Sequence, residues 1–100
     1  MSYFNVLLTC AGRRNYLMHY FAEALGNRGQ VLVADASESA PTMMEASQGF
    51  LVPPVNHPDY FDIILDICLK NNVTILVSLN DIELLLLAQQ KERFQAAGIL

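Results

Sequence analysis

Apolar runs and amphipathic stretches alternate along the whole chain. Short runs rich in valine, isoleucine and leucine, each bounded by turn-forming residues, are typical of buried parallel strands. They occupy residues 5–9, 30–34, 50–52 and 73–77. Between them, apolar residues recur at the spacing of a helix, over residues 14–25, 59–70 and 81–96, with one weaker turn at 43–46. The pattern therefore predicts strands that alternate with helices.

Such an alternation is the pattern of βαβ units, in which right-handed crossovers build a parallel sheet. The fold class that we expect is α/β, a small Rossmann-like three-layer sandwich with a parallel sheet. A chain of 100 residues suits one domain of ordinary size. We therefore expect residues 1–100 to form a single domain.

The end of the chain suggests that more follows. Gly98-Ile99-Leu100 has the pattern of another strand that is only beginning. The chain is also unusually apolar, with 53% hydrophobic and 16% charged residues, and a short chain cannot bury such an excess completely. We expect either that this stretch is a fragment of a longer protein or that one of its faces meets a partner, and we favour the fragment.

Four consecutive leucines, Leu84, Leu85, Leu86 and Leu87, cover more than one side of the predicted last helix. A surface helix normally keeps one face polar. This helix is therefore either wedged between the layers of the fold or in contact with another domain or subunit. We favour the contact, and a homodimer through this helix is one form of it.

Charge and spacing exclude several classes of partner. Six basic against ten acidic residues give a net charge of −4, whereas a nucleic-acid binder needs a basic surface. No apolar run approaches the ~20 residues of a membrane span, and no signal peptide is visible. The two cysteines, Cys10 and Cys68, lack the spacing of a metal or redox site. We expect a cytoplasmic protein with reduced thiols, without a metal site and without a nucleic-acid or membrane partner.

Candidate chemistry gathers in the loops that follow the predicted strands. In an open parallel sheet, ligands bind beyond the carboxyl ends of the strands, where the strand order reverses. This rule selects residues 10–14, 35–39 and 78–83, which are also rich in polar side chains. We therefore expect any binding site to be built from these three loops.

The turn Ala11-Gly12-Arg13-Arg14 opens the first predicted helix. Gly12 would let a ligand approach the backbone, and a helix N-terminus favours an anion. Arg13 and Arg14 add fork-shaped donors that suit a carboxylate or a phosphate. In the alternative interpretation, Gly12 only makes the turn and the arginines are solvated or pair with Asp81 or Glu83.

Asp35 ends the second predicted strand, in the place where dinucleotide-binding folds carry the acid that binds ribose. Those folds also need a GxGxxG turn, and this chain has one glycine there. A helix N-cap or a loop hydrogen bond is therefore the favoured role of Asp35.

Asp81 and Glu83 bring two carboxylates to the same cleft as the arginines, next to Ser78 and Asn80. They are candidate substrate-binding or anion-site residues. They also fit the start of a helix, with Asp81 as its cap and Glu83 as a first-turn acid. Both roles can coexist.

The motifs together resemble a known family. They are Thr9-Cys10-Ala11-Gly12-Arg13-Arg14 after the first strand, Ala34-Asp35 after the second, and Leu79-Asn80-Asp81-Ile82-Glu83-Leu84 after the fourth. This arrangement resembles the N-terminal pre-ATP-grasp domain of ATP-grasp ligases, particularly those similar to the carbamoyl-phosphate synthase large chain. The resemblance covers nearly the whole chain, from Asn5 to Leu100.

The resemblance implies a part of a larger ligase. In that family, ATP and Mg²⁺ are held mainly by ATP-grasp domains that follow this one. A carboxylate is phosphorylated to an acyl phosphate, which an amine or ammonia then attacks. Gly12, Arg13 and Arg14 would line the substrate side of the cleft, Asp35 would shape its rim, and Asp81 and Glu83 would orient a substrate or the neighbouring domain.

The expected partners are therefore a small carboxylate and a downstream ATP-grasp domain, and this stretch alone is expected to be inactive. Two other hypotheses stay open. The chain is alternatively a free-standing Rossmann-like module that binds a nucleotide or a small anion, or a structural domain with an empty cleft.

Overall fold

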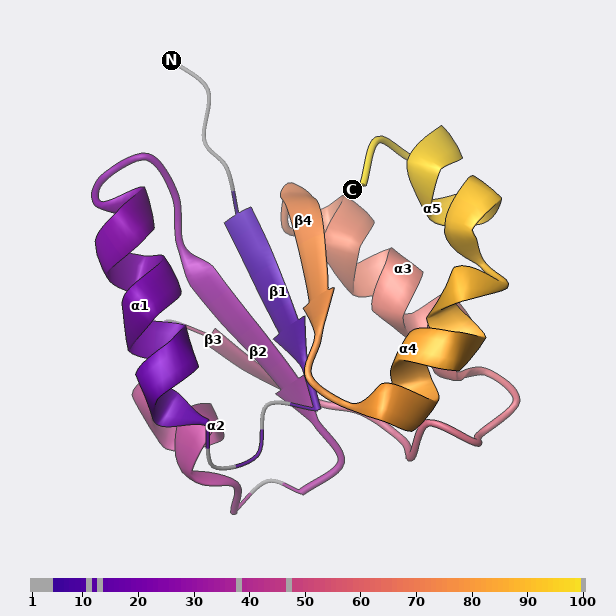
Figure 1. Cartoon of the computed structure of the whole chain (residues 1–100), viewed down its shortest axis with the longest axis horizontal. Helices are drawn as coiled ribbons and strands as arrows, with labels where there is room; N and C mark the ends of the chain where they lie inside the picture. The colour runs from indigo at the N-terminus through magenta and orange to yellow at the C-terminus, as the bar shows by residue number, and fades with distance from the viewer. Residues whose placement is uncertain (1–4, 11, 13, 38, 47, 100) are drawn as a thin grey trace.

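The strands and helices follow one another largely in the predicted order. The computed structural model describes residues 5–10, 12, 14–37, 39–46 and 48–99 (Figure 1). The elements are β1 (Asn5–Thr9), α1 (Asn15–Leu25), β2 (Val31–Asp35), α2 (Pro41–Glu45), β3 (Gln48–Leu51), α3 (Tyr60–Lys70), β4 (Val73–Ser78), α4 (Asp81–Ala88) and α5 (Lys91–Ala96).

The strands form a parallel sheet in the order β3-β2-β1-β4. β1 lies inside the sheet, with Thr9 paired to Ala34 of β2 on one side and to Ser78 of β4 on the other. The chain moves outward from β1 through β2 to β3, and then returns to place β4 on the opposite side of β1. The strand order therefore reverses between β1 and β4.

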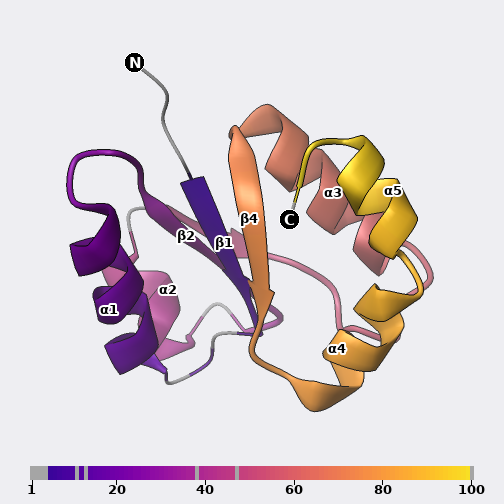
Figure 2. The ribbon, with the colours of Figure 1, turned by 45° about the horizontal axis from the view of Figure 1, so that its top comes forward.

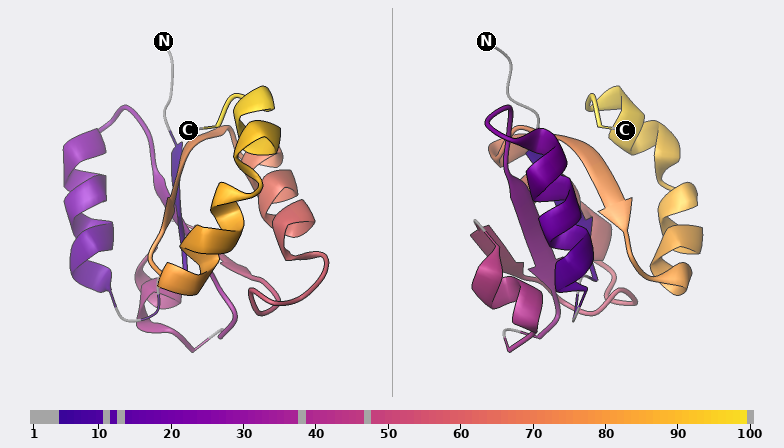
Figure 3. Two further views of the ribbon diagram at one scale, coloured as in Figure 1. Left: turned by 45° about the vertical axis from the view of Figure 1, so that its right-hand side comes forward. Right: turned by 60° about the vertical axis from the view of Figure 1, so that its left-hand side comes forward.

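Helices cover both faces of this sheet. α1 and α2 lie on one face, and α3, α4 and α5 lie on the other (Figure 3, left). This arrangement confirms the predicted α/β fold class and the Rossmann-like three-layer sandwich.

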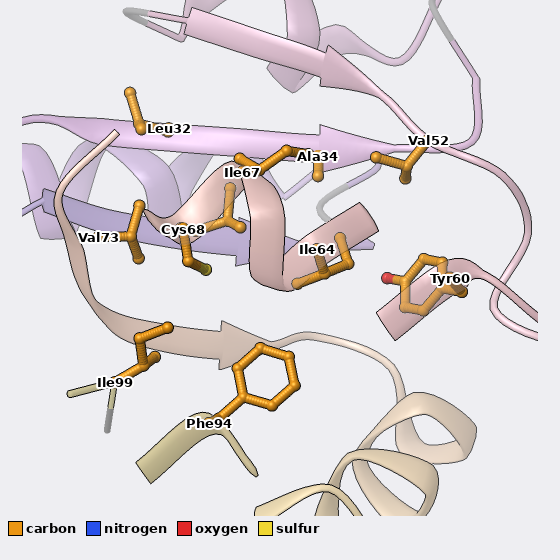
Figure 4. Packing of buried hydrophobic residues seen from close by; sticks show 11 residues of the cluster. Leu32, Ala34, Val52, Tyr60, Ile64, Ile67, Cys68, Val73, Phe94 and Ile99 are labelled. Carbon is orange, nitrogen blue, oxygen red and sulfur yellow. The ribbon is translucent and has the colours of Figure 1, made fainter. Parts of the chain in front are cut away.

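Two hydrophobic clusters fill the spaces between the layers. Because side chains of a strand alternate between faces, Leu7 packs into one cluster with α3, while Leu8 packs into the other with α1. Both leucines are completely buried, and each contributes about 2 kcal/mol of stability by leaving water. Figure 4 shows the first cluster, to which α3 contributes Tyr60, Ile64, Ile67 and Cys68.

The prediction of one continuous helix over residues 81–96 was wrong. α4 ends at Ala88, where the N–H groups of Gln89 and Gln90 donate to the carbonyls of Leu86 and Leu87, three residues back. α5 then starts in a new direction (Figure 2), which buries Phe94 in the first cluster. Glutamine is compatible with a helix, so the sequence gives no local signal for this break.

The predicted opening of a strand at Gly98 and Ile99 was also wrong, while Leu100 lies outside the described residues. Ile99 donates its N–H to the Phe94 carbonyl and Gly98 donates to the Gln95 carbonyl, each at 3.0 Å, and Gly98 has a φ of 83°. This is a Schellman motif, in which a glycine in the left-handed region ends the helix. The residue after the glycine, here Ile99, then makes an apolar contact with a residue in the last turn of the helix, here Phe94. Phe94 and Ile99 are both buried in the first cluster (Figure 4).

The leucine-rich helix α4 is not wedged between layers, because Leu84 and Leu85 are 54% and 73% exposed. Leu87 packs against the first cluster instead. Leu84 and Leu87 border a groove of about 270 Å³ that runs between α4, α5 and Leu76 of β4. The contact of this helix with another domain or a second copy stays a prediction. Among the described helices, none is both long and apolar enough to cross a membrane.

Candidate functional site

The reversal of strand order brings two loops together at the carboxyl end of the sheet. Thr9 and Ser78 are neighbours in the register of β1 and β4. One residue further, the Leu79 N–H donates to the Thr9 carbonyl at 3.1 Å, so the two strands stay paired to their ends. Beyond this pair the chain diverges, because α1, which follows β1, and α4, which follows β4, lie on opposite faces of the sheet (Figure 3, left). This is the place where open parallel sheets bind ligands.

Gly12 makes the turn from β1 toward α1. Its φ is 53°, in the left-handed region that favours glycine, and a Cβ at this position would meet nothing within 4 Å. The Gly12 N–H donates to Asp35 Oδ2 at 2.8 Å, and its carbonyl accepts from the Thr42 hydroxyl at 2.9 Å. The turn is therefore fixed from two sides by hydrogen bonds. Cys10 also has a positive φ, of 54°, which is uncommon for a residue with a side chain.

Asp35 makes loop hydrogen bonds, which is one of the two roles that the sequence favoured for it. Its Oδ2 accepts from Gly12, and its Oδ1 accepts from the Ser37 N–H at 2.9 Å. The half-exposed carboxylate thus ties the loop after β2 to the turn after β1. Both of its oxygens are engaged with backbone N–H groups, so a ribose hydroxyl would have to share them.

Arg14 reaches across from the first loop to the second. It stands just before α1, whose first turn holds no acidic residue. Its Nη1 donates to the Leu79 carbonyl beyond β4. This bond uses one of the five N–H donors of the guanidinium, and the residue is exposed. A cation is therefore held at the solvent edge of the switch point.

Glu83 is buried, with a relative exposure of 1%. Its Oε1 accepts hydrogen bonds from the Thr9 hydroxyl, at 2.6 Å, and from the Ser78 hydroxyl, while its Oε2 accepts one from the Tyr60 hydroxyl. These donors come from the ends of β1 and β4 and from the start of α3. Within the described residues, Glu83 does not pair with Arg14; the other parts of that alternative, a solvated arginine or a pair with Asp81, stay open, because Arg14 is exposed and the Asp81 side chain is outside the described part of the chain.

The start of α4 also stabilises the Glu83 carboxylate. Asn80, in an extended conformation, caps the helix, and its Oδ1 accepts from the Glu83 N–H at 3.0 Å. Asn80 therefore takes the capping role that we expected of Asp81. Glu83 lies in the first helical turn, near the positive end of the helix dipole, which favours a negative charge.

The buried carboxylate affects two neighbouring groups. Burial, and next the hydrogen bond and charge of Glu83, raise the pKa of the Tyr60 hydroxyl well above its ordinary value. Burial and the charge of Glu83 also raise the pKa of the Cys10 thiol to about 12. The Cys10 Sγ lies 4.0 Å from the Tyr60 oxygen. Both groups therefore stay protonated at neutral pH, and Cys10 is a weak nucleophile.

The structure brings most of the predicted site residues to one edge of the sheet. Gly12, Arg14, Asp35 and Glu83 all lie there, whereas Arg13 and the side chain of Asp81 lie outside the described part of the chain. Glu83 is under the surface instead of facing the cleft. The described residues contain no group of three or more His, Cys, Asp or Glu side chains placed to hold a metal ion.

Two residues that contribute to the site, Thr9 and Tyr60, were not among the predicted site residues. A threonine that ends an apolar strand and a tyrosine just behind Pro58-Asp59 are the only signals that they give. Neither signal points to Glu83, which is 74 and 23 residues away in the chain.

The site combines a cation at the surface with an anion beneath it, separated by the two loops. The exposed part can bind a small anion, because arginine donors match the oxygens of a carboxylate.

The comparison with known protein families agrees with this architecture. Residues 6–100 match the family described as "PylC-like, N-terminal domain". The chain belongs to this family, whose members are pre-ATP-grasp-type domains of ATP-grasp ligases. The predicted family resemblance is thereby confirmed. No curated protein matches the chain.

Proposed function

We propose that this PylC-like N-terminal domain forms the substrate-facing wall of an ATP-dependent ligase that joins a carboxylate to an amine or ammonia. Membership of the family supports the ligase class. One observation supports the role within it: the Arg14 guanidinium is held between the two switch-point loops by the Leu79 carbonyl. The proposed reaction, in which a carboxylate is activated as an acyl phosphate, is similar to that of carbamoyl-phosphate synthase.

In this proposal, the N–H groups of Arg14 that do not bind Leu79 donate hydrogen bonds to a carboxylate group of the substrate. Charge-assisted bonds of this kind fix both the position and the orientation of an acid. The turn at Gly12 leaves open space beside the backbone, so the substrate can approach closely. Asp35 keeps that turn in place through its bond to the Gly12 N–H.

The remaining chemistry belongs to a downstream ATP-grasp domain. Mg-ATP held there would transfer its γ-phosphoryl group to the carboxylate, giving an acyl phosphate and releasing ADP. The amine then attacks the acyl carbon, and inorganic phosphate leaves. The residues of this chain bind and orient the acid. The two free cysteines suit a reducing compartment, and we place the enzyme in the cytoplasm.

The test is a titration of the chain with small carboxylates, followed by the NMR signals of its backbone amides. We expect acetate and glutamate to shift the signals of Gly12 and of the first turn of α1. Arg14→Ala should weaken this binding about tenfold or more, because a charge-assisted bond is lost. In a protein that joins this domain to an ATP-grasp domain, the same variant should lose acid-dependent ATP hydrolysis.

Arg28→Ala is the matched control, because Arg28 is an exposed arginine at the other end of α1, bonded to the Ala24 and Leu25 carbonyls. It should bind carboxylates as the original chain does. Carboxylate binding that survives Arg14→Ala would reject the site. Tight binding of NAD or AMP by the isolated chain would favour the free-standing nucleotide-binding module instead.

A further inference from the structure

The buried Glu83 holds both neighbours of the residue that positions Arg14. On one side of Leu79, the Ser78 hydroxyl donates to Glu83 Oε1. On the other side, Asn80 accepts the Glu83 N–H at 3.0 Å. Leu79 lies between these two anchors, and its carbonyl is the group that binds the Arg14 guanidinium.

The same carboxylate fixes the opposite strand. The Thr9 hydroxyl donates to Glu83 Oε1 at 2.6 Å, and the Thr9 carbonyl accepts the Leu79 N–H at 3.1 Å. Leu79 is thus restrained through its N–H by β1 and through its neighbours by Glu83. In this restrained segment, the Leu79 carbonyl faces the Arg14 guanidinium and accepts its hydrogen bond.

Stability alone does not account for a carboxylate in this position. Removing a charge from water has a large free-energy cost, and apolar residues of similar volume often serve a fold as well or better. Here the Glu83 carboxylate accepts three hydroxyl donors and makes no ion pair among the described residues. Such a network gives geometric specificity, because each donor has one direction in which it can satisfy the buried oxygen atoms.

We propose that Glu83 is a positioning residue that sets the place of the Arg14 guanidinium through the segment Ser78-Leu79-Asn80. It does not touch the substrate. The proposal deepens the proposed function only in its last step, in which Arg14 binds a carboxylate. The positioning itself is a property of the free chain and can be measured without a ligand.

The experiment follows the side-chain N–H signals of Arg14 by NMR, assigned by their loss in Arg14→Lys. In the original chain these signals should differ from those of a freely solvated arginine and should exchange slowly with water. In Glu83→Gln they should move to the position and exchange rate of a solvated arginine. The backbone amide signals of β1 and β4 report whether the variant stays folded.

Glu92→Gln is the matched control, because Glu92 is also a first-turn glutamate, in α5, but is exposed. It should leave the Arg14 signals unchanged. A folded Glu83→Gln chain with the original Arg14 signals would overturn the proposal. If Glu83→Gln does not fold, Ser78→Ala takes its place, since it removes the hydroxyl that links Glu83 to the loop, together with its contacts to the Asn80 backbone. Unchanged Arg14 signals in Ser78→Ala would overturn the proposal equally.

The carboxylate titration then separates the two proposals. Glu83→Gln should bind acetate about tenfold more weakly than the original chain, as expected when a charged donor loses its alignment. If the original chain binds no carboxylate while Arg14 still responds to Glu83→Gln, the proposed function fails and the positioning role stands.

Discussion

The two ends of the sheet use polar side chains in different ways. At the amino end, Asn5 donates to the Asn71 carbonyl at 2.7 Å and accepts the Gln30 N–H at 3.0 Å. One uncharged amide thereby joins the turns that lead into β2 and β4. At the carboxyl end, Glu83 collects hydroxyl groups from β1, β4 and α3 around a buried charge.

The difference separates the hydrogen bonds that strand pairing requires from the additional polar network at the carboxyl end. Satisfying backbone groups at a strand end requires only a neutral amide, as Asn5 demonstrates. A buried carboxylate surrounded by side-chain hydroxyls carries a desolvation penalty that a neutral residue avoids. The carboxyl end therefore contains an arrangement beyond what pairing the strands requires, and it lies at the place where ligands bind in such sheets.

Glu83→Gln should have the largest effect on stability. The amide keeps one acceptor oxygen but turns an NH₂ group toward hydroxyls that need an acceptor. Losses of this kind in a buried network lower the free energy of unfolding by about 2–4 kcal/mol. Urea denaturation measures the change, with the exposed Glu92→Gln as the control. A loss below about 1 kcal/mol would mean that the network tolerates a neutral side chain and that the two ends do not differ.

The two thiols should respond differently to the same change. Burial raises the pKa of Cys68 to about 12, whereas burial together with Glu83 raises that of Cys10 to about 12. Glu83→Gln should lower the Cys10 pKa, because the charge of Glu83 is lost, and should leave that of Cys68 unchanged. Alkylation rates over a range of pH, in Cys68→Ala and Cys10→Ala backgrounds, measure each thiol separately. An equal shift in both thiols would show that the variant loosens the whole core.

Both thiols also make stability depend on pH. Their folded-state pKa values lie above the value of 9.0 for an unperturbed cysteine, so the folded chain keeps these protons longer than the unfolded chain. Their contribution is complete below about pH 9 and is lost as the pH rises toward 12. In Glu83→Gln, the part of this loss that Cys10 causes should still begin near pH 9 but should be smaller and end at a lower pH, because the folded-state pKa lies closer to the unperturbed value.

Asn5→Ala should have a smaller effect and should not reach the other end of the sheet. It leaves the Asn71 carbonyl and the Gln30 N–H without their side-chain partner, and water can replace part of the loss at this partly exposed position. We expect a destabilisation of about 1–2 kcal/mol in urea denaturation. The Arg14 side-chain signals should stay in place. Their displacement would show that the two ends are coupled through β1.

Asp35→Asn should have the smallest effect. Asp35 accepts two backbone N–H groups, but it is only half-buried, so the remaining oxygen and water can satisfy them. We expect a loss of about 1 kcal/mol or less. A loss as large as that of Glu83→Gln would mean that burial does not make one of these carboxylates more important to stability than the other.

The sequence predicted the fold because the information is local. Each strand is an apolar run between turn-forming residues, and each long helix shows the helical spacing of apolar residues within its own segment. The alternation of strands and helices can therefore be read from one segment to the next. The break between α4 and α5 could not be predicted in this way. It exists because Phe94 and Ile99 must reach the first cluster, which depends on the position of α3 and β4 and not on the glutamines where the break occurs.

The site was predicted in part for the same reason. Switch-point geometry selected the correct loops, and the residue types at Gly12, Arg14 and Asp35 indicated a turn, a cation and a loop acceptor. The burial of Glu83 could not be read from its surroundings, because a first-turn glutamate in a helix is usually solvated. Its burial depends on hydroxyls from three other elements, which only the tertiary fold brings together.

The central place of β1 also has a consequence for how the chain folds. β1 is synthesised first among the strands, but one of its two neighbours, β4, ends at Ser78, and the bond from Thr9 to Glu83 closes a separation of 74 residues. Contacts between such distant residues slow folding, because a long loop must close before they form. A nascent chain therefore exposes one open edge of β1 until β4 has left the ribosome, and the polar network is among the last native features to form.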